Sequence, residues 1–274
     1  MRLLDRMDFK LPPREENSHK GTFGKVLNIS GSRFMPGAAF ISSMAALKSG
    51  CGYVFLATDE CVMSLGSWAT SAIVFTHTAS ILENLKSSNS LLIGCGLGTD
   101  LRAVEIFKRT FSESLKIPVV IDADGLNLLA EYGIDNLPEN LVLTPHPLEA
   151  SRLLGGVEVE KILQDSVHWA GEISQRYNCV TVLKMHNTVV TSPYGEVYIN
   201  TTGNSAMAKA GSGDVLAGII ASFLAQGVEI YTAATLAVYL HGLAGDIARD
   251  NLTAYCVLPN DLIDHLPLAF QRVM

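Results

Sequence analysis

A short loop of small residues with a single acid, Gly211-Ser212-Gly213-Asp214, has the composition of an anion-binding site. Apolar residues recur at helical spacing from Asp214 onward, so we expect a helix to begin at these glycines. The start of a helix presents unpaired N–H groups and the positive end of its dipole, and glycines let a ligand approach that backbone. The loop is not a Walker A motif, because no G-x-x-x-x-G-K-[ST] string occurs. Alternatively, Ser212 only caps the helix and Asp214 only complements its dipole.

A second glycine-rich string, GCGLGTD (94–100), directly follows the apolar run SLLIG. Alternating glycines between a strand and a helix suit the close approach of a phosphate. The spacing is G-x-G-x-G, and the nearest later acids, Asp122 and Asp124, are loosely placed, which makes a dinucleotide-binding fingerprint a weak interpretation. A tight turn with Asp100 as helix cap is an equally good one.

The string LTPHPLEA (143–150) places His146 where a strand is expected to end and Pro147 to open a helix. The carboxyl ends of parallel strands line the ligand crevice of α/β sheets, so His146, Asp122 and Asp124 are expected to gather there. Pro147 and Glu149 are also ordinary residues for a helix start. A histidine between two prolines has no obvious structural benefit, which favours a function for His146.

Two further segments could contribute to such a site. In HKGTFGKVLNISGS (19–32), Lys20 and Lys25 are candidate phosphate contacts, although a solvated loop explains either lysine alone. The small run at 36–39, ending in Ala39, opens a helix and would let a flat ring or a sugar approach. His241 lies in a mostly apolar helical stretch and is expected to be a packed residue rather than a ligand.

The elements that position these residues follow a regular order. Continuous Val/Ile/Leu runs alternate with helical patterns, which predicts a parallel sheet covered on both faces; the runs lie at 26–30, 53–58, 90–94, 119–123 and 141–145. Three further runs separated by short turns predict an antiparallel edge at 179–200, and helices are expected near 213–226, 229–249 and 260–270. We expect residues 1–274 to form one α/β domain.

The composition excludes several classes of function. The net charge is −7 and no dense Lys/Arg run occurs, which argues against a nucleic-acid surface. The five cysteines include no C-x-x-C pair, so neither a structural zinc site nor a disulfide framework is expected. The first residues lack a secretory signal and no run is long enough to cross a membrane, so we expect a cytoplasmic location.

Taken together, the six strings HKGTFGKVLNISGS, MPGAAF, GCGLGTD, VVIDADGLNLL, LTPHPLEA and GNSAMAKAGSGDVLAGIIA resemble, in this order, the ADP/ATP-dependent NAD(P)H-hydrate dehydratases. The resemblance covers about residues 18–270 and implies a ribokinase-like fold in the stand-alone form, without an epimerase domain. It also implies a repair reaction: a nucleotide phosphorylates the hydroxyl of the S epimer of hydrated NADH or NADPH, and loss of phosphate restores the ring.

The resemblance carries roles to individual residues. Ala39, Gly98, His146 and Asp214 match positions that contact the hydrated dinucleotide, with Asp214 as the catalytic base. The adenine nucleotide is expected on the cradle loop, as we call Gly211, Ser212 and Gly213, and on the KMHNT loop, Lys184, Met185, His186, Asn187 and Thr188. This loop departs from the family's K-G-A-x-T pattern at residues 185 and 186, and Cys95 stands where proline is usual.

The resemblance also implies Mg²⁺, ADP or ATP as phosphoryl donor, and a homotetramer. Asp122 and Glu149 are the candidate magnesium residues, through outer-sphere contacts. Lys209, just before the cradle loop, is a further candidate for a positive charge near phosphate. Two alternatives remain at this point, a vitamin-precursor or sugar kinase of the same fold and a non-catalytic dinucleotide-binding protein.

Overall fold

The computed structural model describes residues 10–66 and 72–274 and places their strands in one sheet. Residues 1–9, on which the absence of a secretory signal partly depends, lie outside the described residues. The described strands follow the order β3-β2-β1-β4-β5-β6-β7-β8-β9 and are β1 (Lys25–Ile29), β2 (Tyr53–Thr58), β3 (Ile73–His77), β4 (Ser90–Ile93), β5 (Val119–Ile121), β6 (Leu141–Leu143), β7 (Val180–Leu183), β8 (Val189–Thr191) and β9 (Val197–Ile199).

The pairing confirms a mostly parallel sheet with an antiparallel edge. All pairs from β3 to β7 are parallel, and β7–β8 and β8–β9 are antiparallel. The expected antiparallel edge at 179–200 is therefore confirmed as β7–β9, and its first strand, β7, joins the rest of the sheet parallel to β6. The turn at 193–195 is confirmed, and Gly195 takes the positive φ of +86° that it requires.

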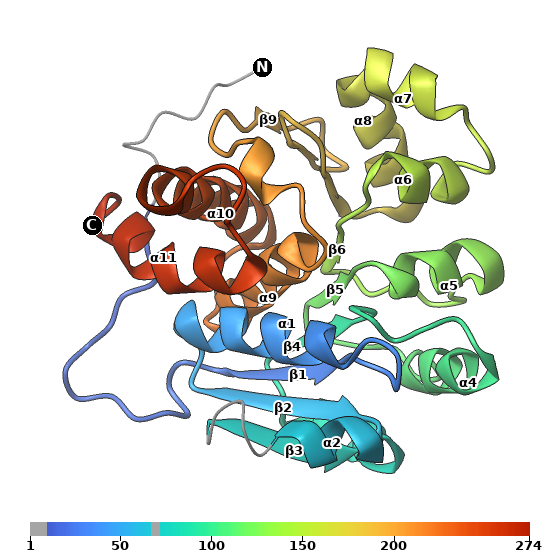
Figure 1. Ribbon diagram of the computed structural model, residues 1–274. Helices are drawn as coiled ribbons and strands as arrows, with labels where there is room; N and C mark the ends of the chain where they lie inside the picture. Colours follow the sequence, from blue (N-terminus) through green and yellow to red (C-terminus); the bar gives the residue numbers. More distant parts are fainter. Residues whose placement is uncertain (1–9, 67–71) are drawn as a thin grey trace.

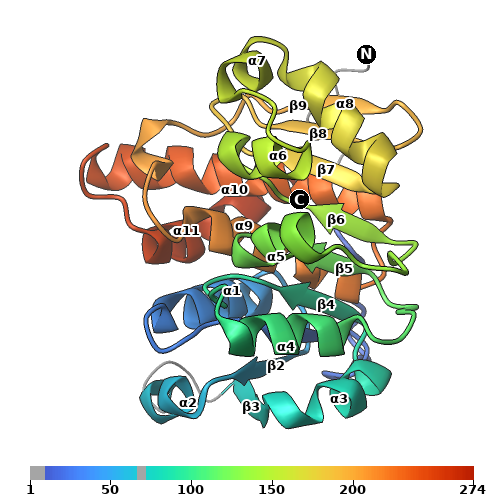
Figure 2. The same cartoon turned by 90° about the vertical axis from the view of Figure 1, so that its right-hand side faces the viewer.

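Helices cover both faces of the sheet (Figures 1 and 2). One face is covered by α1 (Pro36–Lys48), α9 (Ser212–Ala225), α10 (Ile230–Leu252) and α11 (Pro259–Gln271). The other face is covered by α3 (Ile81–Ser87), α4 (Leu101–Thr110), α5 (Asp124–Tyr132), α6 (Pro147–Leu153) and α8 (Ser166–Tyr177), while the short α7 (Val159–Gln164) packs on α6 and α8 and α2 (Glu60–Gly66) follows β2.

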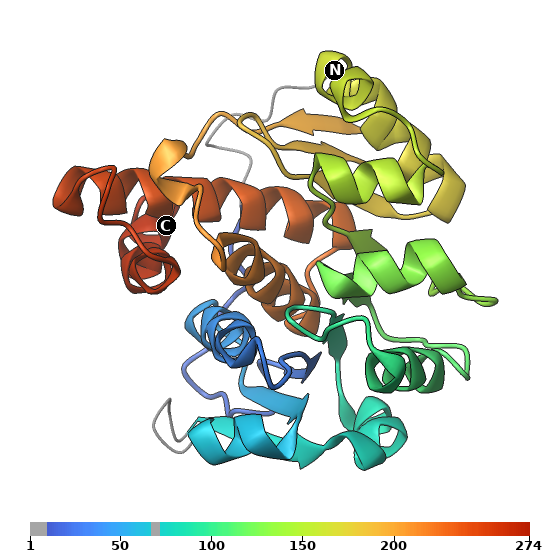
Figure 3. The ribbon, with the colours of Figure 1, turned by 45° about the vertical axis from the view of Figure 1, so that its right-hand side comes forward.

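Alternation along the strands builds the two cores between these layers. In β1, for example, Val26 packs toward α9 and α10, and Leu27 packs into the opposite core. Both residues are fully buried, as a strand covered on both faces requires. Helix α9 is buried along nearly its whole length and anchors the cradle loop against the sheet (Figure 3). None of the described helices combines the length and apolar character needed to cross a membrane.

Candidate active site

The site lies where the strand order reverses, between β1 and β4. The chain winds outward from β1 to β3 and then returns to β4 on the other side, so the loops after β1 and β4 diverge and leave room at the carboxyl ends of the strands. A hydrogen bond from Gly31 N–H to the Cys95 carbonyl, 2.8 Å, ties these two loops together. Gly94 has φ +121°, and a Cβ there would lie 2.0 Å from the Asp122 carbonyl oxygen, so only glycine fits.

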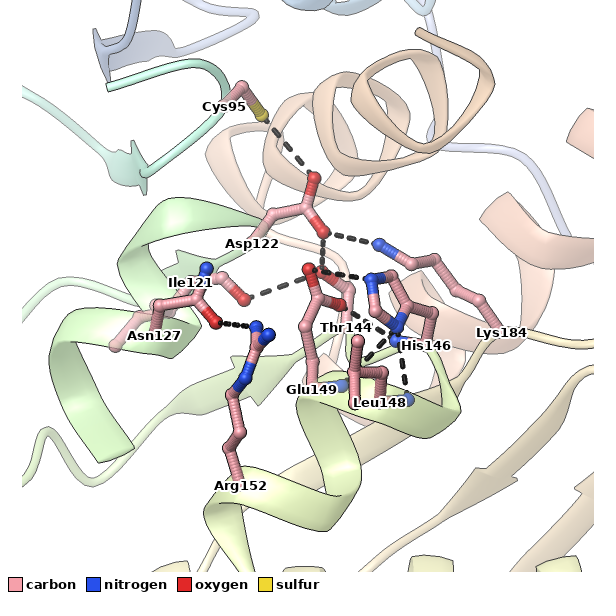
Figure 4. Close-up of polar contacts among 10 residues, drawn as sticks. All are labelled: Cys95, Ile121, Asp122, Asn127, Thr144, His146, Leu148, Glu149, Arg152 and Lys184. Carbon is pink, nitrogen blue, oxygen red and sulfur yellow. Dashed lines mark hydrogen bonds and ion pairs between the residues drawn. The ribbon is translucent and has the colours of Figure 1, made fainter. Parts of the chain in front are cut away.

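A buried ion pair forms the centre of the site (Figure 4). Lys184 Nζ lies 2.5 Å from Asp122 Oδ1, which also accepts a 2.6 Å hydrogen bond from Thr144 Oγ1. Burial alone would raise the pKa of Asp122, but the Lys184 charge and these hydrogen bonds lower it below its usual value. Burial likewise opposes the Lys184 charge, yet Asp122 and Glu149 raise its pKa overall. The pair is therefore ionised.

Asp214 lies beside this pair, in the first turn of α9. Burial and, next, the Asp122 charge raise the pKa of Asp214 to about 7, against the lowering effects of Lys184 and of a hydrogen bond with Cys95. Ligating atoms of Cys95, Asp122 and Asp214 all lie within 4.8 Å of one another. A carboxyl group with a pKa near neutrality, next to a charged pair, has the properties of a general base.

His146 is the N-cap of α6, which corrects the expectation that this histidine has no structural benefit. Its Nδ1 accepts hydrogen bonds from Leu148 N and Glu149 N, and Glu149 Oε2 accepts one from His146 N, a reciprocal capping box. Burial and the Lys184 charge lower the pKa of His146, so its ring is neutral. Glu149 is a helix-start residue, as the structural alternative to a functional role predicted. Burial raises the pKa of Glu149 to about 7.

The cradle loop begins α9 as expected, but Ser212 does not cap it. Gly211 is the N-cap, with φ +99°, and no side chain supplies a capping hydrogen bond. Gly213 contacts the central lysine, because a Cβ at this position would lie 3.2 Å from Lys184 Nζ. The cradle loop and the buried ion pair are therefore parts of one site.

A cavity of about 980 Å³, here called the cradle cavity, opens next to this loop. It brings together many of the predicted residues: His146, Lys184, Met185, His186, Thr188, Ser212 and Gly213. Lys209 and Arg249 also line it, and its described lining contains no aspartate or glutamate. Lys184 and Arg249 are paired with Asp122 and Asp250, which lie outside the lining. Basic side chains without an acid in the lining fit an anionic ligand. His241, expected to be a packed residue, lines it as well.

The remaining predicted residues lie around the cavity or away from it. Asp122, Glu149, Asn187, Gly211 and Asp214 are not part of its lining. Asp122 is 1 % exposed and Glu149 is 5 % exposed.

Ala39 is fully buried, and its Cβ would lie 2.7 Å from a Cβ placed on Gly31. Gly98 N donates to Asp124 Oδ2 at 2.8 Å, and the space where its side chain would be is open. Asp100 caps α4, as expected if the GCGLGTD string forms a turn before a helix.

Lys20 and Lys25 lie at the wrong end of the sheet to contact phosphate at this site. Lys25 begins β1, whereas the site lies beyond the carboxyl end of that strand. The ammonium groups of Lys20 and Lys25 lie 4.9 Å and 5.7 Å from the Tyr53 ring centroid. The loop alternative therefore describes them better. A second cavity of about 800 Å³, lined by the ends of α1 and α9, also lies at this far end and contains none of the predicted residues.

Sequence reasoning gave no role to three residues that build the site. Thr144 supports Asp122, Cys95 contributes a thiol 3.5 Å from Asp122 Oδ2, and Ala123 takes φ +49° between Asp122 and Asp124. The positive φ of a non-glycine residue indicates strain held at the site. No sequence signal marks the Ala123 conformation, whereas the position of Cys95 inside GCGLG could have indicated its proximity.

Comparison with known proteins identifies relatives of the chain. A family model described as NAD(P)H-hydrate dehydratase matches residues 26–268. The ADP-dependent (S)-NAD(P)H-hydrate dehydratase of Neisseria meningitidis is 40% identical over 87% of this chain and 81% of its own length. The bifunctional NAD(P)H-hydrate repair enzyme of Moorella thermoacetica is 39% identical over 96% of this chain, which spans 52% of that protein.

A solved structure agrees with these matches. The ADP/ATP-dependent NAD(P)H-hydrate dehydratase of Bacillus subtilis, co-crystallised with ATP and Mg²⁺, superposes with a TM-score of 0.86 and is 32% identical. The match covers 96% of this chain and 95% of that one. The expected ribokinase-like fold is thereby confirmed.

Proposed function

The chain belongs to the NAD(P)H-hydrate dehydratase family, and we propose that it restores the S epimer of hydrated NADH and NADPH, with ADP or ATP as phosphoryl donor. It is a lyase-type enzyme, as its named relatives are. The observation that carries the proposal is the juxtaposition of Asp214, with a pKa of about 7, and the cationic cradle cavity. In the proposal, Asp214 accepts a proton from the substrate hydroxyl, and the cradle cavity holds the nucleotide.

The chemistry follows from leaving-group ability. Hydroxide leaves a carbon poorly, and phosphate leaves readily. In the proposal, Asp214 takes the hydroxyl proton as that oxygen attacks the terminal phosphorus of the nucleotide, and the bond from this phosphorus to the nucleotide breaks. With ADP, the products of this step are AMP and a phosphorylated hydrate. Phosphate then leaves one ring carbon with its bonding electrons, the neighbouring ring carbon loses a proton, and the double bond forms between them. The N–H groups of Gly211–Gly213 stabilise the charge on the transferred group.

Lys184 positions the acid groups and bridges the two halves of the site. Its side chain reaches from the end of β7 to Asp122 and passes beside Gly213. We assign the nucleotide to the cradle cavity, between residues 184–188 and the cradle loop. We assign the hydrated dinucleotide to the side of Asp214 where Gly98 and His146 lie. Ala39 packs against the turn at Gly31 and so supports this side of the site. Gly98 suits this role because the space over its Cα is open.

The KMHNT loop, which departs from the family pattern at 185 and 186, is closed by a hydrogen bond within the loop. Thr188 Oγ1 donates to the Met185 carbonyl at 3.2 Å, and His186 and Asn187 are exposed. The Met185 side chain packs partly on the core below β7 and partly lines the cavity. We infer that this loop contacts the nucleotide through Met185 and Thr188.

The acid groups also fit a magnesium ion in the outer-sphere manner. Asp122, Asp214 and Glu149 share one buried cation, Lys184, and the pKa values of Asp214 and Glu149 are raised mainly by burial and further by the Asp122 charge. Both Asp122 oxygens are already engaged by protein groups, so Asp122 and Glu149 would hold the hydrated ion through its water ligands. When bound, Mg²⁺ neutralises charge on the nucleotide phosphates.

The proposal is tested by incubating the protein with hydrated NADH, Mg²⁺ and either ADP or ATP. Recovery of the absorbance of the reduced nicotinamide ring, with one phosphate released per ring restored, is the expected result. A small-molecule kinase would produce a phosphorylated product without that recovery, and a binding protein would give neither. We also propose a homotetramer, which sedimentation equilibrium tests.

A further inference from the structure

One wall of the cradle cavity is formed by a segment with little regular secondary structure. This wall segment, residues 200–209, follows β9 and contains a single 3₁₀ turn, Ser205–Met207. Eight of its ten residues line the cavity: Asn200, Thr202, Gly203, Asn204, Ser205, Met207, Ala208 and Lys209. Because the segment lacks the hydrogen bonds of a helix or a sheet, contacts with a neighbouring element have to fix its position.

Asp246, on α10, supplies the polar part of these contacts. Its Oδ2 accepts a 2.9 Å hydrogen bond from Gly203 N, and its Oδ1 accepts a 2.8 Å hydrogen bond from Asn204 Nδ2. The Asn204 Oδ1 in turn accepts a 3.0 Å hydrogen bond from Ala206 N, in the 3₁₀ turn. One carboxylate therefore fixes two successive residues through charge-assisted hydrogen bonds. Asp246 is absent from the described lining of the cavity, so it acts on a ligand there through the wall segment.

Glycines on the same helix supply the apolar part. Met207 packs over Gly245, where an added Cβ would lie 2.2 Å from Met207 Sδ. A Cβ placed on Gly203, which has φ +100°, would lie 3.4 Å from the Gly242 Cα. Glycine in a helix interior is less stable than alanine, so the close approach of the wall segment explains why α10 has glycine at both positions.

The start of the wall segment is fixed independently of Asp246. Thr202 Oγ1 donates a 2.9 Å hydrogen bond to the Tyr239 carbonyl. Loss of the Asp246 contacts would therefore loosen residues 203–207 without releasing β9. The groups proposed for chemistry lie on other elements, with Asp214 on α9 and Lys184 directly after β7.

A wall that is ordered before the ligand arrives raises the affinity of the cavity. When a loop becomes ordered only in the complex, the cost of ordering it reduces the binding free energy. If the wall segment were docked on α10 for only a tenth of the time, the apparent Kd of a ligand that needs it would rise about 10-fold.

We propose that Asp246 is a positioning residue for the phosphoryl donor, because it holds the wall segment on α10 in the conformation that receives the nucleotide. The inference rests on the proposed function only in taking the ligand of the cradle cavity to be a nucleotide.

A residue exchange between Asp246 and Asn204 tests the pairing by calorimetric binding of ADP, without turnover. Asp246→Asn replaces one acceptor by an N–H group and should weaken ADP binding about 10-fold. Asn204→Asp sets two carboxylates against each other and should weaken it too. In the double variant the new amide donates to the new carboxylate, and Gly203 N and Ala206 N keep their acceptors. The pair also keeps a single charge, so most of the affinity should return.

Glu229→Gln is the matched control for these variants. Glu229 likewise accepts two backbone N–H hydrogen bonds, from Tyr231 and Thr232, but at the opposite end of α10. This variant should leave ADP affinity unchanged.

Gly245→Ala tests the same wall by a second route and also serves if the Asp246 variants do not fold. The added methyl group should displace Met207 and weaken ADP binding, although alanine normally stabilises a helix interior. Gly171→Ala, on α8, is its control, because an added Cβ there meets open space, and it should leave ADP affinity unchanged.

Two further measurements separate positioning from a general loss of structure. In Asp246→Asn the KM for ADP should rise with the Kd, while kcat at saturating ADP and the KM for the hydrate stay nearly unchanged. Hydrogen exchange of the ligand-free variant should be faster at the amides of residues 203–207, which tests the docking of the wall without a nucleotide.

Four results would overturn the inference. Unchanged ADP affinity in Asp246→Asn despite faster exchange would leave Asp246 only a structural role. A fall in kcat with unchanged ADP affinity would place its effect on the chemistry. No recovery in the double variant would contradict the pairing, and a wild-type protein that binds neither ADP nor ATP would remove the ligand. A protein that shows the predicted pattern of ADP binding but restores no hydrate would retain the inference and lose only the proposed function.

Discussion

Replacing Asp214 by asparagine should lower kcat strongly and stabilise the fold, and the stabilisation should depend on pH. The pKa of this carboxyl rises from 3.8 to about 7 on folding, mainly because of burial. Between these values the native state holds a proton that the unfolded chain has lost, so the free energy of unfolding falls as pH rises. Each pKa unit corresponds to about 1.36 kcal/mol, which gives an upper limit of about 4 kcal/mol for this carboxyl. Asparagine carries no such penalty.

Denaturant unfolding of wild type and Asp214→Asn across this pH range measures the effect. The variant should gain little near pH 4, gain progressively up to about pH 7, and keep a constant advantage of about 2–4 kcal/mol above it. Asp100→Asn is the matched control for the chemical change, because asparagine caps a helix as well as aspartate does. A pH-independent difference for Asp214→Asn, or a variant less stable than wild type at pH 8, would refute the reasoning.

Three further predictions concern the residues around this carboxyl. His146→Ala removes the helix cap and should lower the free energy of unfolding by about 1 kcal/mol, whereas His146→Asn keeps a cap and should keep that stability. An increase of KM for the hydrate in both variants would show a substrate contact that is independent of capping. Equal stability of the two variants would contradict the capping role. Cys95→Ala removes a hydrogen bond that lowers the pKa of Asp214, so the acidic limb of kcat should move to higher pH, and an unmoved limb argues against this contact. Ala123→Gly should stabilise the fold by about 1 kcal/mol and raise the melting temperature, because glycine adopts the positive φ without strain. A lower melting temperature of this variant would show that Ala123 is not strained.

The central strands were predictable because each is buried on both faces. Runs such as YVFLAT are apolar throughout their interior, and β2 occupies 53–58 as expected. The edge strand β3 escaped prediction for the opposite reason. Its Ile73 is buried while Val74 is 39 % exposed, and it ends in threonine and histidine, so its apolar run is short.

The direction of β7 could not be derived without α8. A strand that follows a short turn suggests an antiparallel neighbour, but a long helical crossover returns the chain parallel to the preceding strand. Helix α8 has a polar exterior and only Ala170, Ile173 and Ser174 buried, so its apolar stripe is narrow. Because this helix was not predicted, the parallel pairing of β7 with β6 was not predicted either.

The loops that form the site were predictable from the sequence, but the pKa values of its acidic residues were not. Carboxyl ends of parallel strands meet at one edge, which brought Asp122 and His146 together as expected. Lys184 was expected only in the nucleotide-binding loop, so its ion pair with Asp122 was not predicted. The pKa values depend on burial and on distances of a few ångströms, and neither is encoded in local sequence. The capping role of His146 likewise depends on the rotamer that turns Nδ1 toward two N–H groups.

The central claim is that Asp214 is the base in a phosphoryl transfer that restores hydrated NADH. The direct test is the rate of ring restoration by wild type and Asp214→Asn at saturating hydrate, ADP and Mg²⁺, with ADP affinity measured alongside. The account predicts a loss of about 10²–10⁴-fold in kcat with ADP affinity nearly unchanged. Comparable rates for the two proteins would contradict it.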